Sequence, residues 1–136
     1  QEHCIMGQQQ LLLLVLAAVI VGVAIVMGIN MFGENASQAN TDAVSQDVLT
    51  IAARAQSWFR RPTAMGGGGR TFIGMQPVNL NFVTPNPNGS YTITGQSLTE
   101  ATITGIGNED PNNDGTNLKV VVKIFADSIG TATITP

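Results

Sequence analysis

The stretch Leu11–Ile29, LLLLVLAAVIVGVAIVMGI, decides the fold of this chain. It is 19 residues long and contains 13 Leu, Ile or Val residues, and no Asp, Glu, Lys or Arg occurs between Glu2 and Glu34. A helix of this length rises by roughly 30 Å, which matches the hydrocarbon core of a bilayer. Each such side chain favours the bilayer centre by about 0.3 to 0.6 kcal/mol, so we expect the segment to enter a membrane.

Three interpretations are open for such a segment: a secretory signal peptide, an ordinary single-span anchor, or a helix that stays in the membrane only until it packs into an assembly. No basic residue precedes the run and no small-residue cleavage pattern directly follows it, which disfavours a signal peptide. Small residues at four-residue spacing favour the third interpretation, because they let helix backbones approach closely. We expect the assembly helix to use Leu11, Leu14, Ala18, Gly22, Ala24 and Gly28.

The helix is expected to continue beyond the apolar run, because no proline occurs from Glu34 to Arg61. Pro62 and the four glycines 66–69 then end it, so the sequence predicts one helix from about Gln8 to Arg60. Its second half is amphipathic, and one helical face is predicted to pack on the rest of the chain. That face comprises Val44, Val48, Ile51, Ala55 and Trp58.

Polar residues recur at seven-residue spacing on the opposite side of this second half. They are Asn40, Asp47, Arg54 and Arg61. Asp42 and Asp47 lie well apart around the helix, so we interpret them as a solvated face and not as paired carboxylates for acid–base work.

The composition after the glycines changes to Thr, Val, Ile, Asn and Gly, which is typical of strands and turns. The predicted strands are Val78–Phe82, Ser90–Thr94, Glu100–Thr104, Leu118–Ala126 and Thr131–Thr135. The fold class is therefore α+β, a long N-terminal helix packed against a small antiparallel sheet. The expected organisation is a leader-like segment 1–7, a helix 8–61 with its membrane or filament-core part at 11–29, and a β-rich head 62–136.

Composition excludes several functions. The net charge of −3 and the 11% content of charged residues leave no basic stripe for nucleic acid. Cys4 and His3 are the only cysteine and the only histidine, so an internal disulfide is excluded, and zinc sites and histidine catalysis are nearly so. No catalytic constellation or phosphate loop is present, and we expect neither enzymatic activity nor a cofactor.

One segment matches the opening of a calcium-binding loop. Asp110, Asn112 and Asp114 alternate and a glycine follows, but Val121 stands where the terminal glutamate would be. An ordinary Asn/Asp/Gly turn explains the same residues, so both interpretations stay open.

The whole arrangement resembles the type IV pilin and pseudopilin family: a glycine, short polar residues, an apolar helix that becomes amphipathic, then a small β-meander. Gly7 followed by Gln8-Gln9-Gln10 resembles a prepilin cleavage site, with the cut after Gly7. The family commonly has a glutamate five residues into the mature chain, where Leu12 stands here, and the residues before Gly7 include no Lys or Arg. By this resemblance Gln8 is the mature N-terminus. Given these departures, either the leader is retained, or processing occurs upstream of Gln1 and the cut is not after Gly7.

The resemblance implies a structural subunit that polymerises with itself into an extracellular filament. It implies an inner-membrane precursor, a prepilin peptidase, methylation of the new N-terminus, and a pilus assembly machinery as partner. It also implies local loss of helical order in the N-terminal half within filaments, for which Gly22 and Gly28 bracket the expected place. The alternative from another class is a membrane-anchored binding module that uses its β-domain.

Overall fold

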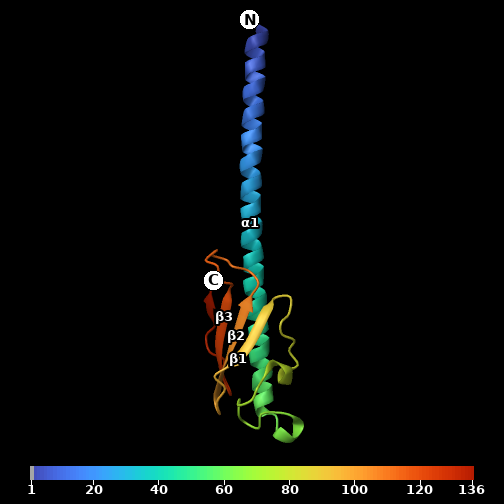
Figure 1. Cartoon of the computed structure of the whole chain (residues 1–136), viewed down its shortest axis with the longest axis vertical. Helices are drawn as coiled ribbons and strands as arrows, with labels where there is room; N and C mark the ends of the chain where they lie inside the picture. The colour runs from blue at the N-terminus through green and yellow to red at the C-terminus, as the bar shows by residue number, and fades with distance from the viewer. Residues whose placement is uncertain (1) are drawn as a thin grey trace. The chain divides into compact units, whose positions relative to one another are not determined.

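A computed structural model describes the backbone of residues 2–136 and the side chains from Gly7 onward, so Gln1 of the leader-like segment lies outside the described residues. The helix α1 runs from Glu2 to Arg60, and a four-stranded antiparallel sheet follows (Figure 1). This confirms the α+β class. Two compact units are present, Gln1–Asn35 and Ala36–Pro136, and the helix belongs to both.

The core of the second unit forms between the Ala36–Arg60 part of α1 and the segments that follow it. All five residues of the expected packing face, Val44, Val48, Ile51, Ala55 and Trp58, are buried in this core. Ala52 and Phe59 extend the same face, and the ring centroids of Phe59 and Phe72 lie 4.6 Å apart. The helical spacing of apolar residues therefore indicated correctly which side of the helix is covered.

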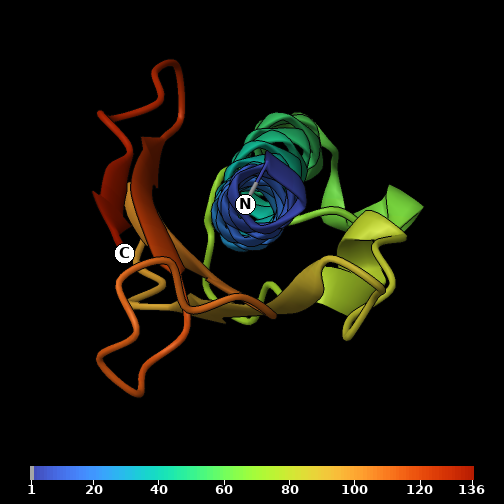
Figure 2. The same ribbon diagram turned by 90° about the horizontal axis from the view of Figure 1, so that it is seen from above.

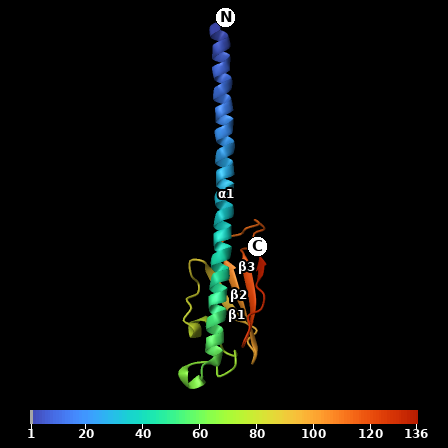
Figure 3. The same cartoon turned by 180° about the vertical axis from the view of Figure 1, so that it is seen from behind.

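The sheet has the order β1-β2-β3-β4, with β1 at Gly89–Thr94, β2 at Glu100–Gly107, β3 at Lys119–Phe125 and β4 at Thr133–Thr135. Its neighbouring strands are all antiparallel. Seen from above, the sheet lies on one side of the Ala36–Arg60 part of α1, and the segment 62–88 lies on another (Figure 2). The view from behind places the same part of α1 in front of the strands (Figure 3).

Alternation along β3 fixes which face of the sheet meets the helix. Val120, Val122 and Ile124 are buried, and Lys119 and Lys123 are exposed. Val122 pairs with Ile103 of β2, which pairs in turn with Ile93 of β1, so one row of apolar side chains crosses the sheet. This is the half-buried strand predicted from the sequence.

One predicted strand is wrong. The segment Val78–Phe82 contains no strand; instead the short 3₁₀ helix η2 covers Pro77–Leu80. Pro77 presets the backbone angle at the first position of this turn, and Gln76 and Asn79 cap each other reciprocally. Asn81 then ends the turn in the left-handed region at φ 53°. Local capping chemistry therefore overrides the strand propensity of Val78 and Phe82.

The four glycines after the helix cap its C-terminus. A short 3₁₀ turn, η1 at Thr63–Met65, ends at Gly66 with φ 79°. The backbone N–H groups of Gly68 and Gly69 donate to the carbonyls of Trp58 and Arg61 at 2.9 and 3.0 Å. A Cβ atom on Gly68 would collide with the Trp58 ring and the Thr71 carbonyl. The loop thus satisfies carbonyls that have no partner within the helix.

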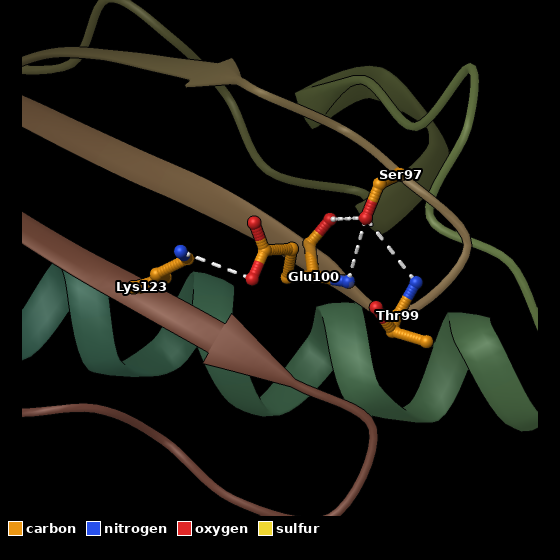
Figure 4. A network of polar contacts seen from close by, with 4 residues as sticks. All are labelled: Ser97, Thr99, Glu100 and Lys123. Atoms are coloured by element: carbon orange, nitrogen blue, oxygen red, sulfur yellow. Dashed lines mark hydrogen bonds and ion pairs between the residues drawn. The ribbon is translucent and has the colours of Figure 1, made fainter.

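The turn between β1 and β2 is held by Ser97 (Figure 4). Its hydroxyl accepts hydrogen bonds from the backbone N–H groups of Thr99 and Glu100, at 3.3 and 3.1 Å, and donates to the Glu100 carbonyl. The Glu100 carboxylate then pairs with Lys123 of β3 at 3.0 Å. Local bonds therefore close the turn, and one surface ion pair joins it to the next strand.

Candidate functional site

The most extensive unpartnered surface of the described residues is the apolar first part of α1. The large apolar side chains between Leu11 and Phe32 are each 54–79% exposed. Soluble monomers rarely expose a contiguous apolar surface of this extent to water. By length and composition, this helix could cross a membrane. The residues expected in the assembly helix, including Leu11 and Leu14, all lie exposed on it.

No contact among the described residues requires glycine at Gly22 or Gly28. A Cβ atom built on Gly22 or on Gly28 would meet no atom within 4 Å. In the sheet, by contrast, a Cβ on Gly105 would approach Val44 and Val48 to 2.9 Å. Glycine inside a helix is unfavourable by about 1 kcal/mol relative to alanine. Among the described residues, nothing at Gly22 or Gly28 offsets that penalty.

The two pairs of small residues lie on different sides of the helix. Ala18 and Gly22 are one turn apart and share a face, as do Ala24 and Gly28. At 3.6 residues per turn, the second pair is rotated by roughly 120° from the first. The segment therefore offers two separate places where another helix backbone could approach closely.

The predicted processing residues lie within the same helix. Gly7 and Gln8 are both helical, and the Gln8 side chain is exposed. A Cβ on Gly7 would also meet no atom within 4 Å. His3 and Cys4 lie among the residues whose side chains are outside the described part of the chain.

The predicted polar stripe of the second half is solvated only in part. Three of its residues, Asn40, Asp47 and Arg54, each hydrogen-bond to a loop from elsewhere in the unit, and we call these three the polar seam. Asn40 donates to the Asn88 carbonyl at 2.9 Å and accepts from the Asn108 N–H at 3.1 Å. Asn40 and Asp47 are therefore half-buried by contacts with loops, whereas Arg54 and Arg61 remain exposed.

Asp47 is the centre of this seam. Its prediction as part of a solvated face is wrong, because its carboxylate is half-buried and hydrogen-bonded. Its Oδ2 atom accepts hydrogen bonds from the Tyr91 hydroxyl at 2.6 Å and from the side-chain amides of Asn88 and Asn86 at 3.0 and 3.1 Å. Burial alone would raise the pKa of Asp47, but these donors outweigh it and hold the pKa below its usual value of 3.8. Asp42 does lie exposed, with the Gln38 amide as its donor.

The pKa of Tyr91, the donor in this contact, is shifted in the opposite direction. Burial, and next the hydrogen bond to the Asp47 carboxylate, raise the pKa of Tyr91 far above its usual value. The hydroxyl therefore remains a donor throughout the physiological pH range. Sequence reasoning missed this pair because 44 residues separate its members along the chain.

Arg54 is the third residue of the seam and also lines a small cavity. Its guanidinium donates to the carbonyls of Leu80 and Asn81 at 3.3 and 2.8 Å. The cavity holds about 330 Å³ and no acidic side chain lines it. The indole Nε1 of Trp58, which is 7% exposed, has no hydrogen-bond partner among the described residues. The cavity is lined by Arg54, Ser57, Trp58, Arg61, Asn79, Leu80 and Asn81.

The calcium-like segment is a turn closed by its own backbone. The Asp110 carboxylate accepts from the N–H groups of Asp114 and Gly115, at 3.3 and 2.8 Å. The Asn112 side-chain amide donates to Asp114, whose carboxylate also accepts from Thr116. Across the described residues, no group of three or more His, Cys, Asp or Glu side chains is placed to hold a metal ion. These contacts are those of an Asx-type turn.

Neither a protein-family model, nor a curated protein, nor a solved structure matches the chain. The fold class of the chain therefore follows from its elements alone. It is an α+β chain with one long N-terminal helix, whose first part is apolar and exposed, and a small antiparallel sheet. This combination is consistent with a pilin-like fold.

Proposed function

We propose that this chain is the structural subunit of an extracellular type IV pilus-like filament, which polymerises through its apolar N-terminal helix. The precursor sits in the inner membrane, with residues 11–29 in the bilayer and the head outside. A prepilin peptidase cuts after Gly7, and an assembly machinery then packs the helices of many copies together. The filament is a homopolymer and no nucleic acid takes part.

The observation that carries the proposal is the apolar segment whose glycines serve no contact inside the chain. A plain membrane anchor needs only apolar length, and Gly22 and Gly28 weaken its helix. Open space at both positions is useful only if another backbone approaches there. Because the second small pair is rotated by roughly 120° from the first, each helix can contact neighbours on two sides, as a multi-helix core requires and a simple dimer does not.

The second unit supports the same proposal. Its core closes on the Ala36–Arg60 part of α1 alone, so it stays folded whether the residues before it lie in lipid or among other helices. A subunit that moves from membrane to filament needs such a head, since its apolar segment exchanges lipid contacts for protein contacts.

The test is electron microscopy of material sheared from cells that express the full chain together with a prepilin peptidase and pilus machinery. We expect thin filaments whose subunit begins at Gln8 by intact mass. Gly22→Leu should abolish or sharply reduce filaments, because the side chain fills the approach between helices. Val23→Leu is the matched control: it keeps the apolar length, enlarges a side chain that is already bulky, and should assemble normally.

The second candidate function is a membrane-anchored binding module, favoured by the cavity beside Arg54 and Arg61. Two guanidinium groups without an acidic lining residue could hold a small anion. If the protein is found only in membranes, without filaments, and Gly22→Leu accumulates like the wild type, the binding module becomes the better account.

A further inference from the structure

Carboxylates gather at one end of the second unit, where the loop 108–117 meets the helix (Figure 1). The Asn40 side chain accepts hydrogen bonds from the backbone N–H groups of Asn108 and Glu109, at 3.1 and 3.3 Å, and so holds this loop beside the start of the unit. Four carboxylates therefore lie at this end, and we call them the acidic pole. They are Asp42, Glu109, Asp110 and Asp114.

The opposite end of the same unit is basic. The backbone N–H of Arg70 donates to the Phe59 carbonyl at 2.8 Å, which holds the loop after the helix against the last turn of α1. Asn40 and Phe59 are roughly 28 Å apart along the helix axis, so the two ends are well separated. Three exposed arginines gather at this second end, and we call them the basic pole. They are Arg60, Arg61 and Arg70.

Neither pole is neutralised by ion pairs within the described part of the chain. Glu100 and Lys123 form the only ion pair among the described residues, and they belong to neither pole. Lys119 lies near the acidic pole and Asp127 near the basic pole, so each end holds one charge of opposite sign. Carboxylates still outnumber basic side chains at one end, and arginines outnumber carboxylates at the other.

The helix dipole explains only part of this separation. The partial negative charge at the end of a helix favours basic side chains there, which accounts for Arg60 and Arg61. No such field favours the acidic pole, because α1 begins at Glu2 and Asp42 lies far inside it. The gathered carboxylates repel one another, and no cation among the described residues is paired with them to offset this repulsion.

We propose that the acidic pole of one copy of this chain docks against the basic pole of the next copy along the filament; this inference rests on the proposed filament. All copies enter it from one membrane in the same orientation, so their helices run parallel. Two heads that follow one another along the filament then present opposite poles to each other. Each pole thereby gains from a neighbouring copy the counter-charges that its own head does not provide.

The charges favour one axial offset between neighbouring heads. Two parallel heads side by side at the same height bring like poles together, and the like charges repel. An offset of about one head length, roughly 28 Å from pole to pole, brings opposite poles together instead. The contact between poles therefore adds directional selection to the packing of the apolar helices, which is not directional by itself.

The test reverses exposed charges at one pole or at both. Arg61→Glu combined with Arg70→Glu reverses the basic pole, and Asp42→Lys combined with Glu109→Lys reverses the acidic pole. The other members of the two poles are kept, because their side chains hydrogen-bond to backbone groups of the unit. The exchange of all four residues inverts both poles and leaves the net charge of the chain unchanged.

The lysines of the sheet provide a matched control. Lys119→Glu combined with Lys123→Glu changes the net charge by the same amount as the reversal of the basic pole. Both side chains are exposed on β3, and neither belongs to a pole. If the position of the charges matters, this control should assemble like the wild type, although it is as acidic as the basic-pole variant.

The measurement is the fraction of subunit recovered in sheared filaments from cells that express the full chain with a prepilin peptidase and pilus machinery. Each reversed pole alone should lower this fraction severalfold, because like poles then meet. The exchange of all four residues should restore most of it. Urea unfolding of the full chain in detergent checks that each variant folds. The milder changes Arg61→Gln and Asp42→Asn should lower the fraction in the same direction, by less.

Wild-type recovery of filaments from either reversed pole would overturn the inference and leave the filament proposal standing. So would a loss that the exchange of all four residues does not restore, because the poles would then contact another component of the assembly machinery. An equal loss in the lysine control would make net charge the cause and would also overturn it. Absence of filaments in the wild type would overturn the proposed function itself.

Discussion

The hydroxyl of Tyr91 donates a 2.6 Å hydrogen bond to the carboxylate of Asp47, and this contact joins the first strand of the sheet to the second half of the helix. The same tyrosine ring and the Phe82 ring form a T-shaped pair whose centroids lie 5.2 Å apart. One residue of β1 thus connects the polar seam with the apolar core.

Removing the Asp47 carboxylate should destabilise the second unit. Asp47→Ala leaves the Tyr91 hydroxyl and the amides of Asn86 and Asn88 without their acceptor, for which we expect a loss of about 1 to 3 kcal/mol in the free energy of unfolding. Asp42→Ala is the matched control, with the same gain in helix propensity and one exposed hydrogen bond lost. Urea unfolding of the full chain in detergent measures both; equal midpoints would contradict the structural role of Asp47.

The stability of the second unit should be constant near neutrality and fall at both extremes of pH. The folded pKa of Asp47 lies below its unfolded value, so its contribution is present above about pH 4 and is lost as the pH falls through the folded pKa. The folded pKa of Tyr91 is raised, so its contribution is present below about pH 10 and is lost above it.

Unfolding midpoints across pH, compared between variants, test these assignments. Asp47→Ala should lose part of the acid-side slope, and Tyr91→Phe should lose the alkaline slope. The range from pH 9 to pH 11 spans the usual tyrosine pKa of about 10. If the wild type and Tyr91→Phe lose equal stability over this range, the alkaline assignment is wrong.

Arg54 should hold the 3₁₀ turn η2 against the helix. Arg54→Ala removes the donors to the Leu80 and Asn81 carbonyls, and we expect a loss of about 1 to 2 kcal/mol together with faster proteolysis within residues 77–83. The control is Arg61→Ala, which is exposed and lies just after the end of the helix, with an effect within about 0.5 kcal/mol. Limited proteolysis followed by mass spectrometry locates the cuts, and an unchanged pattern in Arg54→Ala would refute the role.

Gly68 should tolerate no side chain. In Gly68→Ala the new Cβ meets the Trp58 ring and the Thr71 carbonyl, so we expect a loss of about 1 to 3 kcal/mol. Gly33→Ala adds the same atom where no neighbour lies within 4 Å and should be neutral or slightly stabilising. Trp58 is the only tryptophan, so a shift of its fluorescence in Gly68→Ala but not in Gly33→Ala reports the contact directly.

The ion pair between Glu100 and Lys123 should contribute little. Both side chains are substantially exposed, at 38% and 52%, and such pairs are worth roughly 0 to 1 kcal/mol. Lys123→Gln should therefore shift the unfolding midpoint less than Asp47→Ala does, and the small effect should vanish in high salt. A larger shift that persists in high salt would show that Lys123 acts through something other than its charge.

The sequence by itself determined the elements that depend on periodicity. Five apolar residues from Val44 to Trp58 at helical spacing indicated the buried side of α1, and alternation in β3 indicated the inner face of the sheet. These patterns are local, and the free energy of burying apolar surface follows them closely. The end of the helix before Pro62 was predictable for the same local reason.

Tertiary structure alone decided what the polar residues of the helix do. Asp47 has the same side chain as Asp42, yet Asp47 accepts three hydrogen bonds from residues 39 to 44 positions away and Asp42 lies in solvent. The caps that made Pro77–Leu80 a 3₁₀ turn, and the N–H groups by which Gly68 and Gly69 close the helix, are likewise pairings of specific atoms. Hydrogen bonds depend on direction and on the position of both partners, so a pattern along one chain cannot fix them until the segments are brought together.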